Sequence, residues 1–558
     1  MLALQQALEA QYSIINYLKA TFSFRERDVD KAFYDYILNP PTSMFKGPYV
    51  RLQLPFVRAN DGDTIPLEIK PNFPSFSHQL QAFQRLHTEG GHTPEPTILT
   101  TGTGSGKTES FMFPLLDYCH KNQHRNGIKA IIMYPMNALA TDQAKRLAET
   151  IWADPRLKGK VTVGLFIGEG KDKNKYPTMM GEHNVIENRN MIIDSPPDIL
   201  LTNFKMLDYG LMQSRFHNLW VHNFEDTDLL KFLVLDELHT YDGAQGTDVA
   251  NLIRRLKLKL NLKRGDLCPI GTSATIGSGA EAPQLLSEYA TTVFGEDFTT
   301  ASIITENRET SDVFFGKTEI DEFFPRLSKI RSTRLQIDEN YAIYLKNQRT
   351  LWQLDERIDA VQLGLELKKL KIVRELVALV DNTYVTVAEL TERLSAINED
   401  FRRLPQLDTE GSYNPKEEVI ISLFALIAEA KVSAKLPLMY VQVQLWVREL
   451  SGILRELSDT PRFTWKSDIK ADSDTKAFPA YFCRDCGASG WLMVKHDNKE
   501  RFENEINDVY EKFFSKHKHI FMVNTKTESH KHIDEYEPTE MRDAFVNVKT
   551  YPFSRKIK

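Results

Sequence analysis

The chain has 558 residues, of which 42% are hydrophobic and 26% are charged, and its formal net charge is -6. This length exceeds what one hydrophobic core supports, so we expect about three to four domains, and the composition is that of an ordinary soluble globular protein. The acidic balance excludes a globally basic nucleic-acid binder and leaves a local groove as the way to bind nucleic acid.

The cysteine content and the first residues indicate a cytoplasmic protein. Four cysteines are too few for a disulfide framework, and the start MLALQQALEA lacks the basic region of a signal peptide. The longest apolar run, from Val419 to Ala428, is far shorter than the roughly 20 residues that span a bilayer. We therefore expect no membrane partner.

Residues 1–75 predict an N-terminal appendage, helical at first and then interrupted by Pro40-Pro41 and Gly47-Pro48. A helix running through Phe83 and Leu86 follows, and Gln79 lies near its start. An amide offers both a donor and an acceptor, which suits the edge of adenine. A glutamine on a solvated helix face is the alternative interpretation.

A glycine-rich segment, TTGTGSGKTE at residues 100–109, stands between the apolar run Ile98-Leu99 and a predicted helix. Its glycines let successive backbone N–H groups converge, and the following helix adds its positive end. The pattern predicts an ATP phosphate site in which Lys107 contacts the β- and γ-phosphates and Thr108 ligates Mg²⁺. Thr101 stands where the strict motif has its first glycine, and a flexible loop with a chance lysine is the alternative. The loop residues assigned to ATP are Thr103, Gly104, Ser105, Gly106, Lys107, Thr108 and Glu109.

Short apolar runs and helical stretches alternate from this loop to about residue 280. The predicted strands are Ala130–Tyr134, Val161–Phe166, Ile199–Thr202, Phe232–Leu235 and Ile270–Ser273, and the predicted helices include Ala138–Ile151 and Asp248–Leu258. Such alternation predicts an α/β domain with a parallel sheet covered by helices. Ligands of these sheets bind beyond the carboxyl ends of the strands.

Two adjacent carboxylates, Asp236 and Glu237, follow the strand Phe232–Leu235. Unpaired charge at the end of a buried strand is costly, and a bound Mg²⁺ would compensate it. In that interpretation Asp236 holds the ion and Glu237 deprotonates the water that attacks the γ-phosphate. The alternative is an acidic helix start. The glycine loop upstream favours the catalytic interpretation.

Five segments together resemble motifs I, Ia, Ib, II and III of superfamily 2 helicases of the DEAD/DEAH-box type. They are TGTGSGKTE, YPMNALATDQAKRL (Tyr134–Leu147), PDILLTNFKMLD (Pro197–Asp208), DELHTYDGAQGTD (Asp236–Asp248) and GTSAT (Gly271–Thr275). The resemblance covers about residues 76–280 and implies a RecA-like domain that binds ATP and Mg²⁺, which we place at residues 76–300. Leu238 stands where these boxes have alanine, which weakens any subfamily label.

The resemblance also implies roles for individual residues. Gln79 resembles the adenine-reading glutamine, and His239 matches the fourth box position. Ser273 and Thr275 match the motif that couples hydrolysis to strand binding. The residues that would hold one nucleic-acid strand by its phosphates, without reading its sequence, are Pro135, Asn137, Gln143, Thr202 and Asn203.

Further segments are similar to large bacterial helicases of DNA repair and phage defence, including the giant helicase of Druantia-type systems. They are YPMNALATDQ, DELHTYDGAQGTDVA, GPY (Gly47–Tyr49), CRDCGASGW (Cys483–Trp491) and PLMYVQVQLWVREL (Pro437–Leu450). This resemblance implies an ATP-dependent DNA helicase or translocase in phage defence or DNA repair.

The sequence after residue 300 has a different character. Residues 301–470 predict a mainly helical accessory region, in which Arg374–Leu394 resembles a helix-turn-helix, with plain helix packing as the alternative. Residues 471–558 carry Cys483 and Cys486, which are spaced as half of a zinc site. The remaining ligands would lie outside the chain or include His496, or else the site is empty.

A second motor half is missing from the sequence pattern. Superfamily 2 ATPases form their site between two RecA-like domains, and the second supplies an arginine through a Q-x-x-G-R-x-x-R motif, which residues 281–558 lack. We therefore expect a second RecA-like domain on a longer parent chain or another subunit. The alternative function is a nucleotide-gated DNA-binding scaffold without processive unwinding.

Overall fold

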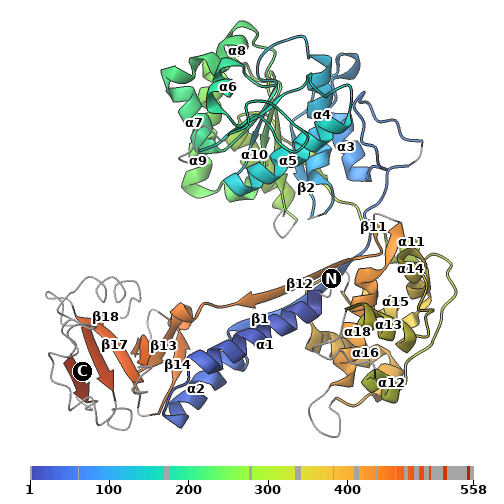
Figure 1. Cartoon of the computed structure of the whole chain (residues 1–558), viewed down its shortest axis with the longest axis vertical. Helices are drawn as coiled ribbons and strands as arrows, with labels where there is room; N and C mark the ends of the chain where they lie inside the picture. Colours follow the sequence, from blue (N-terminus) through green and yellow to red (C-terminus); the bar gives the residue numbers. More distant parts are fainter. Residues whose placement is uncertain are drawn as a thin grey trace. The chain divides into compact units, whose positions relative to one another are not determined.

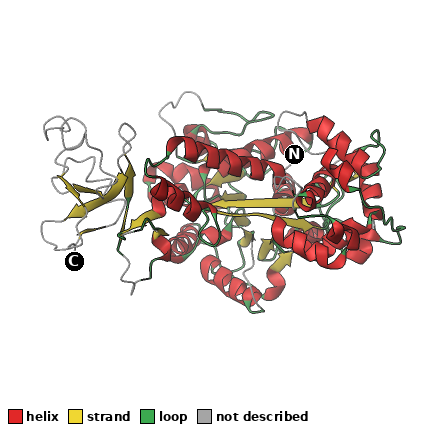
Figure 2. Ribbon diagram, turned by 90° about the horizontal axis from the view of Figure 1, so that it is seen from below, coloured by secondary structure: helices red, strands yellow, loops and turns green. Residues whose placement is uncertain are grey.

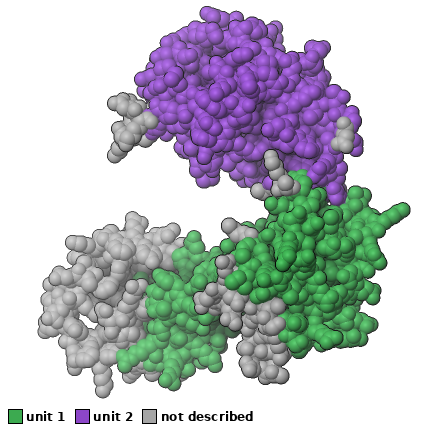
Figure 3. All heavy atoms as spheres, turned by 45° about the vertical axis from the view of Figure 1, so that its right-hand side comes forward, with its two compact units in different colours: residues 1–55, 310–558 green, residues 56–309 purple. Residues whose placement is uncertain are grey.

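The chain folds into two compact units, residues 56–309 and residues 1–55 together with 310–558 (Figure 3). We call the first the sheet unit and the second the accessory unit. The computed structural model describes residues 3–60, 62–102, 104–168, 176–274, 280–332, 341–380, 383–406, 414–433, 436–458, 460–470, 476–482, 489–495, 502–503, 520–524 and 549–552.

The sheet unit is built on seven parallel strands in the order β4-β5-β3-β6-β7-β2-β8. The strands are β2 (Thr97–Thr100), β3 (Ala130–Met133), β4 (Val163–Phe166), β5 (Ile199–Thr202), β6 (Phe232–Leu235), β7 (Cys268–Ser273) and β8 (Ile303–Thr305). This arrangement confirms the predicted α/β class with a RecA-like parallel sheet.

Helices cover both faces of this sheet (Figure 1). The main ones are α3 (Ser77–Leu86), α4 (Lys107–Lys121), α5 (Asn137–Ala153), α7 (Phe204–Met212), α9 (Gly243–Lys259) and α10 (Ala282–Phe294), with the shorter α6 (Arg189–Asp194) and α8 (Val221–Glu225). Leu99 packs into the core beneath α3, α4 and α5, whereas its neighbour Ile98 packs into the core beneath α7, α9 and α10. Because both faces are buried, the strands read as continuous apolar runs.

The limits of the sheet unit differ from the predicted domain 76–300. Strand β8 pairs with β2 beyond the predicted end, and bridges join Phe56 to Arg308 and Arg58 to Phe76. Residues 56–75 therefore belong to the sheet unit instead of an N-terminal appendage. A three-residue strand is too short to give a periodic signal, so the sequence did not reveal it.

The remaining N-terminal residues are part of the accessory unit. Strand β1 (Phe45–Gln53) pairs antiparallel with β12 (Tyr440–Val447) and with β9 (Val385–Thr386). The helix α1 (Ala3–Thr21) runs along β1 and β12 (Figure 1), and α2 (Arg27–Leu38) follows it. The predicted separate appendage thus joins a sheet whose other strands come from far along the chain.

Helices dominate the described part of residues 310–433, as predicted, but the described part of residues 436–482 is mainly strands and loops, and the described residues after 488 lie in strands (Figure 2). The helices are α11 (Ser311–Phe315), α12 (Leu327–Ser332), α13 (Tyr341–Leu351), α14 (Ala360–Lys369), α15 (Lys371–Val380), α16 (Val387–Ile397), α17 (Glu399–Arg403) and α18 (Pro415–Glu429). The further strands are β10 (Lys431–Ser433), β11 (Leu436–Pro437), β13 (Ile453–Glu456), β14 (Phe463–Trp465), β15 (Ala477–Phe478), β16 (Ala480–Phe482), β17 (Ser489–Lys495), β18 (Phe502–Glu503), β19 (Ile520–Asn524) and β20 (Lys549–Pro552).

The segment that resembles a helix-turn-helix comprises α15, β9 and α16. Helix α16 buries Leu390 and Leu394 in the accessory core, while Glu389, Glu392 and Arg393 are exposed. Two carboxylates against one guanidinium do not suit a phosphate backbone, so the structure favours helix packing over a DNA contact at this helix. No helix among the described residues has the length and apolar character needed to cross a membrane.

Candidate nucleotide-binding site

The predicted phosphate loop lies between the carboxyl end of β2 and the start of α4. Gly104 and Gly106 have φ values of 80° and 75°, in the left-handed region that favours glycine, and Gly106 caps α4. The first N–H groups of a helix have no partner within it, so this end of α4 suits an anion. Lys107, Thr108 and Glu109 form the first turn of α4. The loop residue Thr103 lies outside the described residues.

Side chains from within and around the loop hold it in place. The Ser105 hydroxyl donates to Thr101 Oγ1 at 2.7 Å, and both residues are buried. Gly102 N–H donates to the carboxylate of Glu306, which follows β8. Thr101, the departure from the strict motif, is thus a hydrogen-bond partner inside the loop. Glu306 carries no sequence signal and was missed.

Helix α3 also contacts the loop, through two buried side chains. The Oε1 atom of Gln79 accepts from Phe76 N–H at 2.9 Å, and its Nε2 donates to the Gly106 carbonyl at 3.1 Å. His78 Nε2 lies 2.8 Å from the Ser105 carbonyl oxygen, and burial lowers the pKa of His78. Gln79 is only 1% exposed, so its amide holds the loop against α3 in this structure. Adenine recognition by Gln79 stays a prediction.

The acidic pair sits at the carboxyl end of β6, next to β7. Thr272 Oγ1 donates to Asp236 Oδ1 at 2.5 Å and accepts from Glu237 N–H at 3.0 Å. Burial is the largest cause that raises the pKa of Asp236 above its ordinary value. A nearby cation would lower that pKa again. Thr272 therefore positions the Asp236 carboxylate and the Glu237 backbone, and the sequence interpretation had named its neighbour Ser273 instead.

The structure brings the predicted catalytic residues together. Lys107 Nζ lies 3.9 Å from Glu237 Oε1, and His239 Nδ1 lies 3.4 Å from Glu237 Oε2. Ser273 Oγ lies 3.2 Å from the same His239 nitrogen. The backbone of Glu237 has a φ of 52°, which is uncommon for a residue with a side chain and is a form of strain found at functional sites. The coupling residue Thr275 lies outside the described residues.

The side chains of this site can ligate Mg²⁺, but they do not form a closed set of protein ligands around a metal ion. Asp236 is a half-buried carboxyl group with a raised pKa, and Thr108 supplies a hydroxyl in the first turn of α4. Among the described residues, no three His, Cys, Asp or Glu side chains cluster as a metal site would require. Mg²⁺ is usually held by one or two carboxylates together with substrate phosphates, which is the set that this site offers. Cys483 and Cys486 lie outside the described residues, so zinc binding is unsupported and stays a prediction.

The residues predicted to hold nucleic acid gather at the same edge of the sheet, but they are not equally available. Asn203 Nδ2 donates to Asn137 Oδ1 at 2.8 Å, which joins the start of α5 to the cap of α7. Pro135, just before α5, and Gln143, within it, are half-buried. Thr202 is fully buried and donates its hydroxyl to the Phe166 carbonyl at 2.7 Å, so that hydroxyl is turned into the fold.

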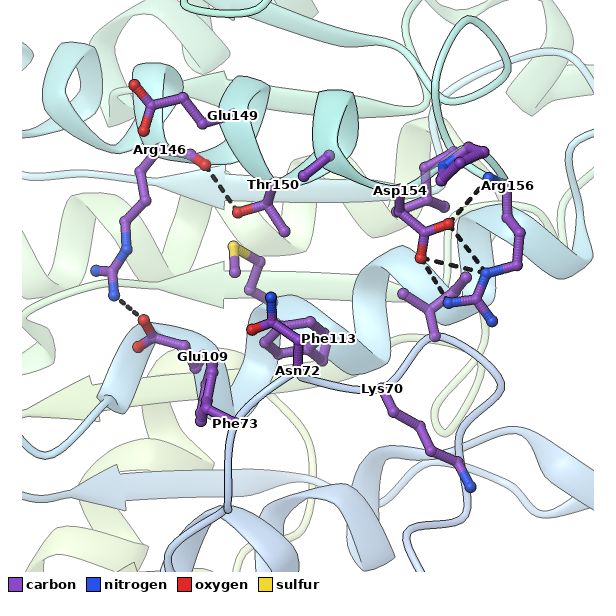
Figure 4. A pocket seen from close by; sticks show the side chains of 15 residues that line it. Lys70, Asn72, Phe73, Glu109, Phe113, Arg146, Glu149, Thr150, Asp154 and Arg156 are labelled. Carbon is purple, nitrogen blue, oxygen red and sulfur yellow. Dashed lines mark hydrogen bonds and ion pairs between the residues drawn. The ribbon is translucent and has the colours of Figure 1, made fainter. Parts of the chain in front are cut away.

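A cavity of about 650 Å³ opens beside the first turn of α4 (Figure 4). It is lined by α4, by α5 and by residues 69–73, and Phe73 and Phe113 provide aromatic surface. Arg146 reaches from α5 to form an ion pair with Glu109 on α4 (Figure 4), and burial lowers the pKa of Arg146. Arg146 lies within the segment that resembles motif Ia, yet the sequence interpretation did not name it.

Comparison with known proteins agrees with this geometry. Residues 76–282 match the family model described as DEAD/DEAH box helicase. The Druantia protein DruE of Escherichia coli (strain UMEA 4076-1) is 26% identical over 371 residues, which cover 49% of this chain and 20% of DruE. The uncharacterized ATP-dependent helicase YprA of Bacillus subtilis (strain 168) is 31% identical over 212 residues, which cover 38% of this chain and 24% of YprA.

A solved structure, that of the DUF1998 helicase MrfA bound to DNA, is 22% identical with a TM-score of 0.35, and the match covers 55% of this chain and 42% of that chain. The chain spans about a fifth to a quarter of the length of the two curated relatives above. Residues 76–282, within its sheet unit, match the DEAD/DEAH box helicase model, and the chain is similar to DruE and YprA.

Proposed function

We propose that this chain is the first motor half of an ATP-dependent DNA helicase or translocase. The observation that carries the proposal is the convergence of Lys107 and Glu237, whose Nζ and Oε1 atoms are 3.9 Å apart, beside the half-buried carboxylate of Asp236. A phosphate-binding cation, a metal-binding carboxylate and a general base are the groups that nucleotide hydrolysis requires.

Each of these groups has a role in cleaving ATP. The loop N–H groups and Lys107 would hold the β- and γ-phosphates, and Asp236 with Thr108 would hold Mg²⁺, which would supply positive charge near the phosphate oxygens. Glu237 accepts a proton from the water that attacks the γ-phosphorus, while the bond to the β-phosphate oxygen breaks and ADP leaves with its electron pair. Lys107 now faces Glu237. Bound phosphates would attract the Lys107 ammonium away from Glu237. The Glu237 carboxylate would then be available to accept a proton from water.

The cavity beside α4 offers space for the base and ribose of the nucleotide. It borders Glu109, two residues after Lys107, and Phe73 and Phe113 present rings that a purine can contact. The Glu109–Arg146 ion pair stands at this cavity and joins α4 to α5. Helix α5 begins at Asn137, at the edge proposed to bind the strand. A nucleotide that changes the position of α5 at the cavity would therefore also change the position of Asn137.

The strand would run along the edge formed by Asn137 and Asn203, held by its phosphates and not by its bases. The resemblance to helicases of DNA repair and phage defence favours DNA as the substrate and a role in one of those processes in the cytoplasm. Small polar side chains and backbone N–H groups can hold phosphates without lysine or arginine, so an acidic chain can bind nucleic acid in this way.

Complete activity requires a second RecA-like domain, from a longer parent chain or another subunit. The absence of a Q-x-x-G-R-x-x-R motif from residues 281–558 supports this, as does the small share of its relatives that the chain spans. An arginine supplied to the γ-phosphate is worth about 10³ to 10⁵ in rate in related systems. A nucleotide-gated scaffold without unwinding is the second candidate, and it rests on the same missing arginine.

The test is DNA-stimulated ATP hydrolysis and strand displacement by the purified chain, with Lys107→Ala beside it. We expect the chain to bind an ATP analogue, to hydrolyse ATP far more slowly than the complete assembly and to displace no strand. Lys107→Ala should lose analogue binding because the phosphates lose their counter-charge. Analogue binding by Lys107→Ala equal to that of the parent would refute the site, and robust unwinding by the chain alone would refute the need for a second half.

A further inference from the structure

The accessory unit has a second surface with nucleic-acid chemistry, on the sheet of β12, β1 and β9. Arg51 lies opposite Gln442, and Lys46 lies opposite Trp446, in the register of β1 with β12. Val50, which alternates with these positions, is buried in the core on the other face. The outward residues, which we call the polar-aromatic face, are Lys46, Arg51, Tyr384, Gln442, Gln444 and Trp446.

Half of this face is already ordered by contacts that cross the strands. The Arg51 guanidinium lies 5.2 Å from the centroid of the Tyr384 ring. The Tyr384 hydroxyl donates to Gln442 Oε1 at 2.9 Å and accepts from Gln444 Nε2 at 3.1 Å. Side chains held in this way lose less conformational entropy when a ligand binds. The network therefore presents a guanidinium and two amides in fixed positions.

The other half presents an open aromatic ring. Trp446 is 62% exposed, and the neighbouring Lys46 is exposed as well. Helix α1 cannot cover this indole, because α1 packs on the opposite face, where Leu4 shares a core with Val50. An exposed tryptophan beside a lysine offers a stacking surface with a counter-charge for phosphate.

We propose that the polar-aromatic face binds a single strand of nucleic acid. A base stacks on Trp446, Lys46 and Arg51 neutralise phosphates, and the amides of Gln442 and Gln444 meet base edges. Charge complementarity favours this occupant, because both charged residues of the face, Lys46 and Arg51, are cations. Asp468, whose pKa Lys46 helps to lower, already forms an ion pair with Arg448. From Gln442 to Trp446 the strand extends about 13 Å, at about 3.3 Å per residue. That length suits two or three nucleotides, as on other sheets that stack bases.

This site is distinct from the edge at Asn137 and Asn203, and it requires no nucleotide. The test measures anisotropy of fluorescein-labelled oligo-dT and oligo-U, 20 nucleotides each, with the full chain and without ATP. Trp446→Ala should weaken binding about tenfold through the lost stacking. Tyr12→Ala is the matched control, since Tyr12 on α1 is also 62% exposed and lies outside the face. Lys46→Gln should reduce the slope of log affinity against log salt by about 0.7, the value for one phosphate contact on a single strand.

The Trp446→Ala effect should persist in an Asn137→Ala/Asn203→Ala background, which separates the face from the motor edge. The same loss of affinity should be seen if the chain fails to hydrolyse ATP, so this proposal is tested independently of the proposed ATPase function. The oligonucleotide that binds with the higher affinity, oligo-dT or oligo-U, identifies the ligand of the face as DNA or RNA. Affinities of Trp446→Ala and Lys46→Gln equal to that of Tyr12→Ala would overturn the proposal. Loss of self-association by Trp446→Ala in sedimentation, with strand binding intact, would assign the face to a second copy of the chain.

Discussion

Substitution of Gly106 by alanine tests how the phosphate loop is held. A Cβ atom at Gly106 would lie 2.2 Å from Gln79 Nε2, and the φ of 75° adds strain that a side chain does not tolerate well. The left-handed conformation costs about 1 to 2 kcal/mol for a residue with a Cβ. The Nε2 atom is the end of the flexible Gln79 side chain, but this side chain is buried and its amide makes two hydrogen bonds. Moving it forfeits about 1 kcal/mol for each bond, so the total loss should be about 3 to 4 kcal/mol.

Gly159 supplies the matched control. Its φ is 71°, and a Cβ there would meet nothing within 4 Å, so Gly159→Ala should cost the strain alone, about 1 to 2 kcal/mol. Both changes reduce the entropy of the unfolded chain equally, so this contribution cancels between them. In a Gln79→Ala background the cost of Gly106→Ala should fall toward that of Gly159→Ala, because the obstacle is gone.

The assay is urea unfolding followed by pulsed hydrogen exchange in peptides of residues 56–309, which reports the sheet unit separately from the accessory unit. Binding of an ATP analogue should weaken in Gly106→Ala and stay unchanged in Gly159→Ala. Equal stability losses for the two variants would refute the argument. A stability loss from Gly106→Ala that is equally large in the Gln79→Ala background would refute it as well.

Four further predictions concern the same site. Glu237→Gln should keep nucleotide and Mg²⁺ binding but lose hydrolysis in the active assembly, because an amide cannot accept the proton of water; undiminished phosphate release would exclude Glu237 as the base. The raised pKa of Asp236 means that its buried charge opposes folding at neutral pH, and this penalty lessens as the pH falls through the folded pKa; Mg²⁺-dependent analogue binding should weaken over the same fall. Thr272→Val removes a hydrogen bond that lowers this pKa, so the midpoint of that pH profile should move to higher pH, whereas an unshifted profile would exclude Thr272 from this role. Thr101→Gly restores the strict motif yet should destabilise the sheet unit by about 1 kcal/mol in urea unfolding, since Ser105 loses its acceptor; a more stable variant would contradict the role given to Thr101.

Local sequence determined the chemistry of the sheet unit. The glycine loop and the acidic pair are short segments whose function depends on residues adjacent in the sequence, so they could be recognised without knowledge of the fold. The strands Ile199–Thr202 and Phe232–Leu235 match their predicted limits, because a strand buried on both faces must be apolar at every position. Lys107 and Glu237 follow two strands of one parallel sheet, and the rule that such strands place their carboxyl ends at one edge accounts for their adjacency.

Tertiary structure alone decided which distant residues complete these segments. Glu306 meets Gly102, and Arg146 meets Glu109, only because chain closure brings separate elements together, and nothing in the local pattern encodes such contacts. The pairing of β1 with β12 joins the two ends of the accessory unit for the same reason. Side-chain direction was equally hidden: a buried Gln79 bound to the loop and an exposed one reading a base have the same sequence. Burial depends on what packs against a residue, and packing is a property of the fold.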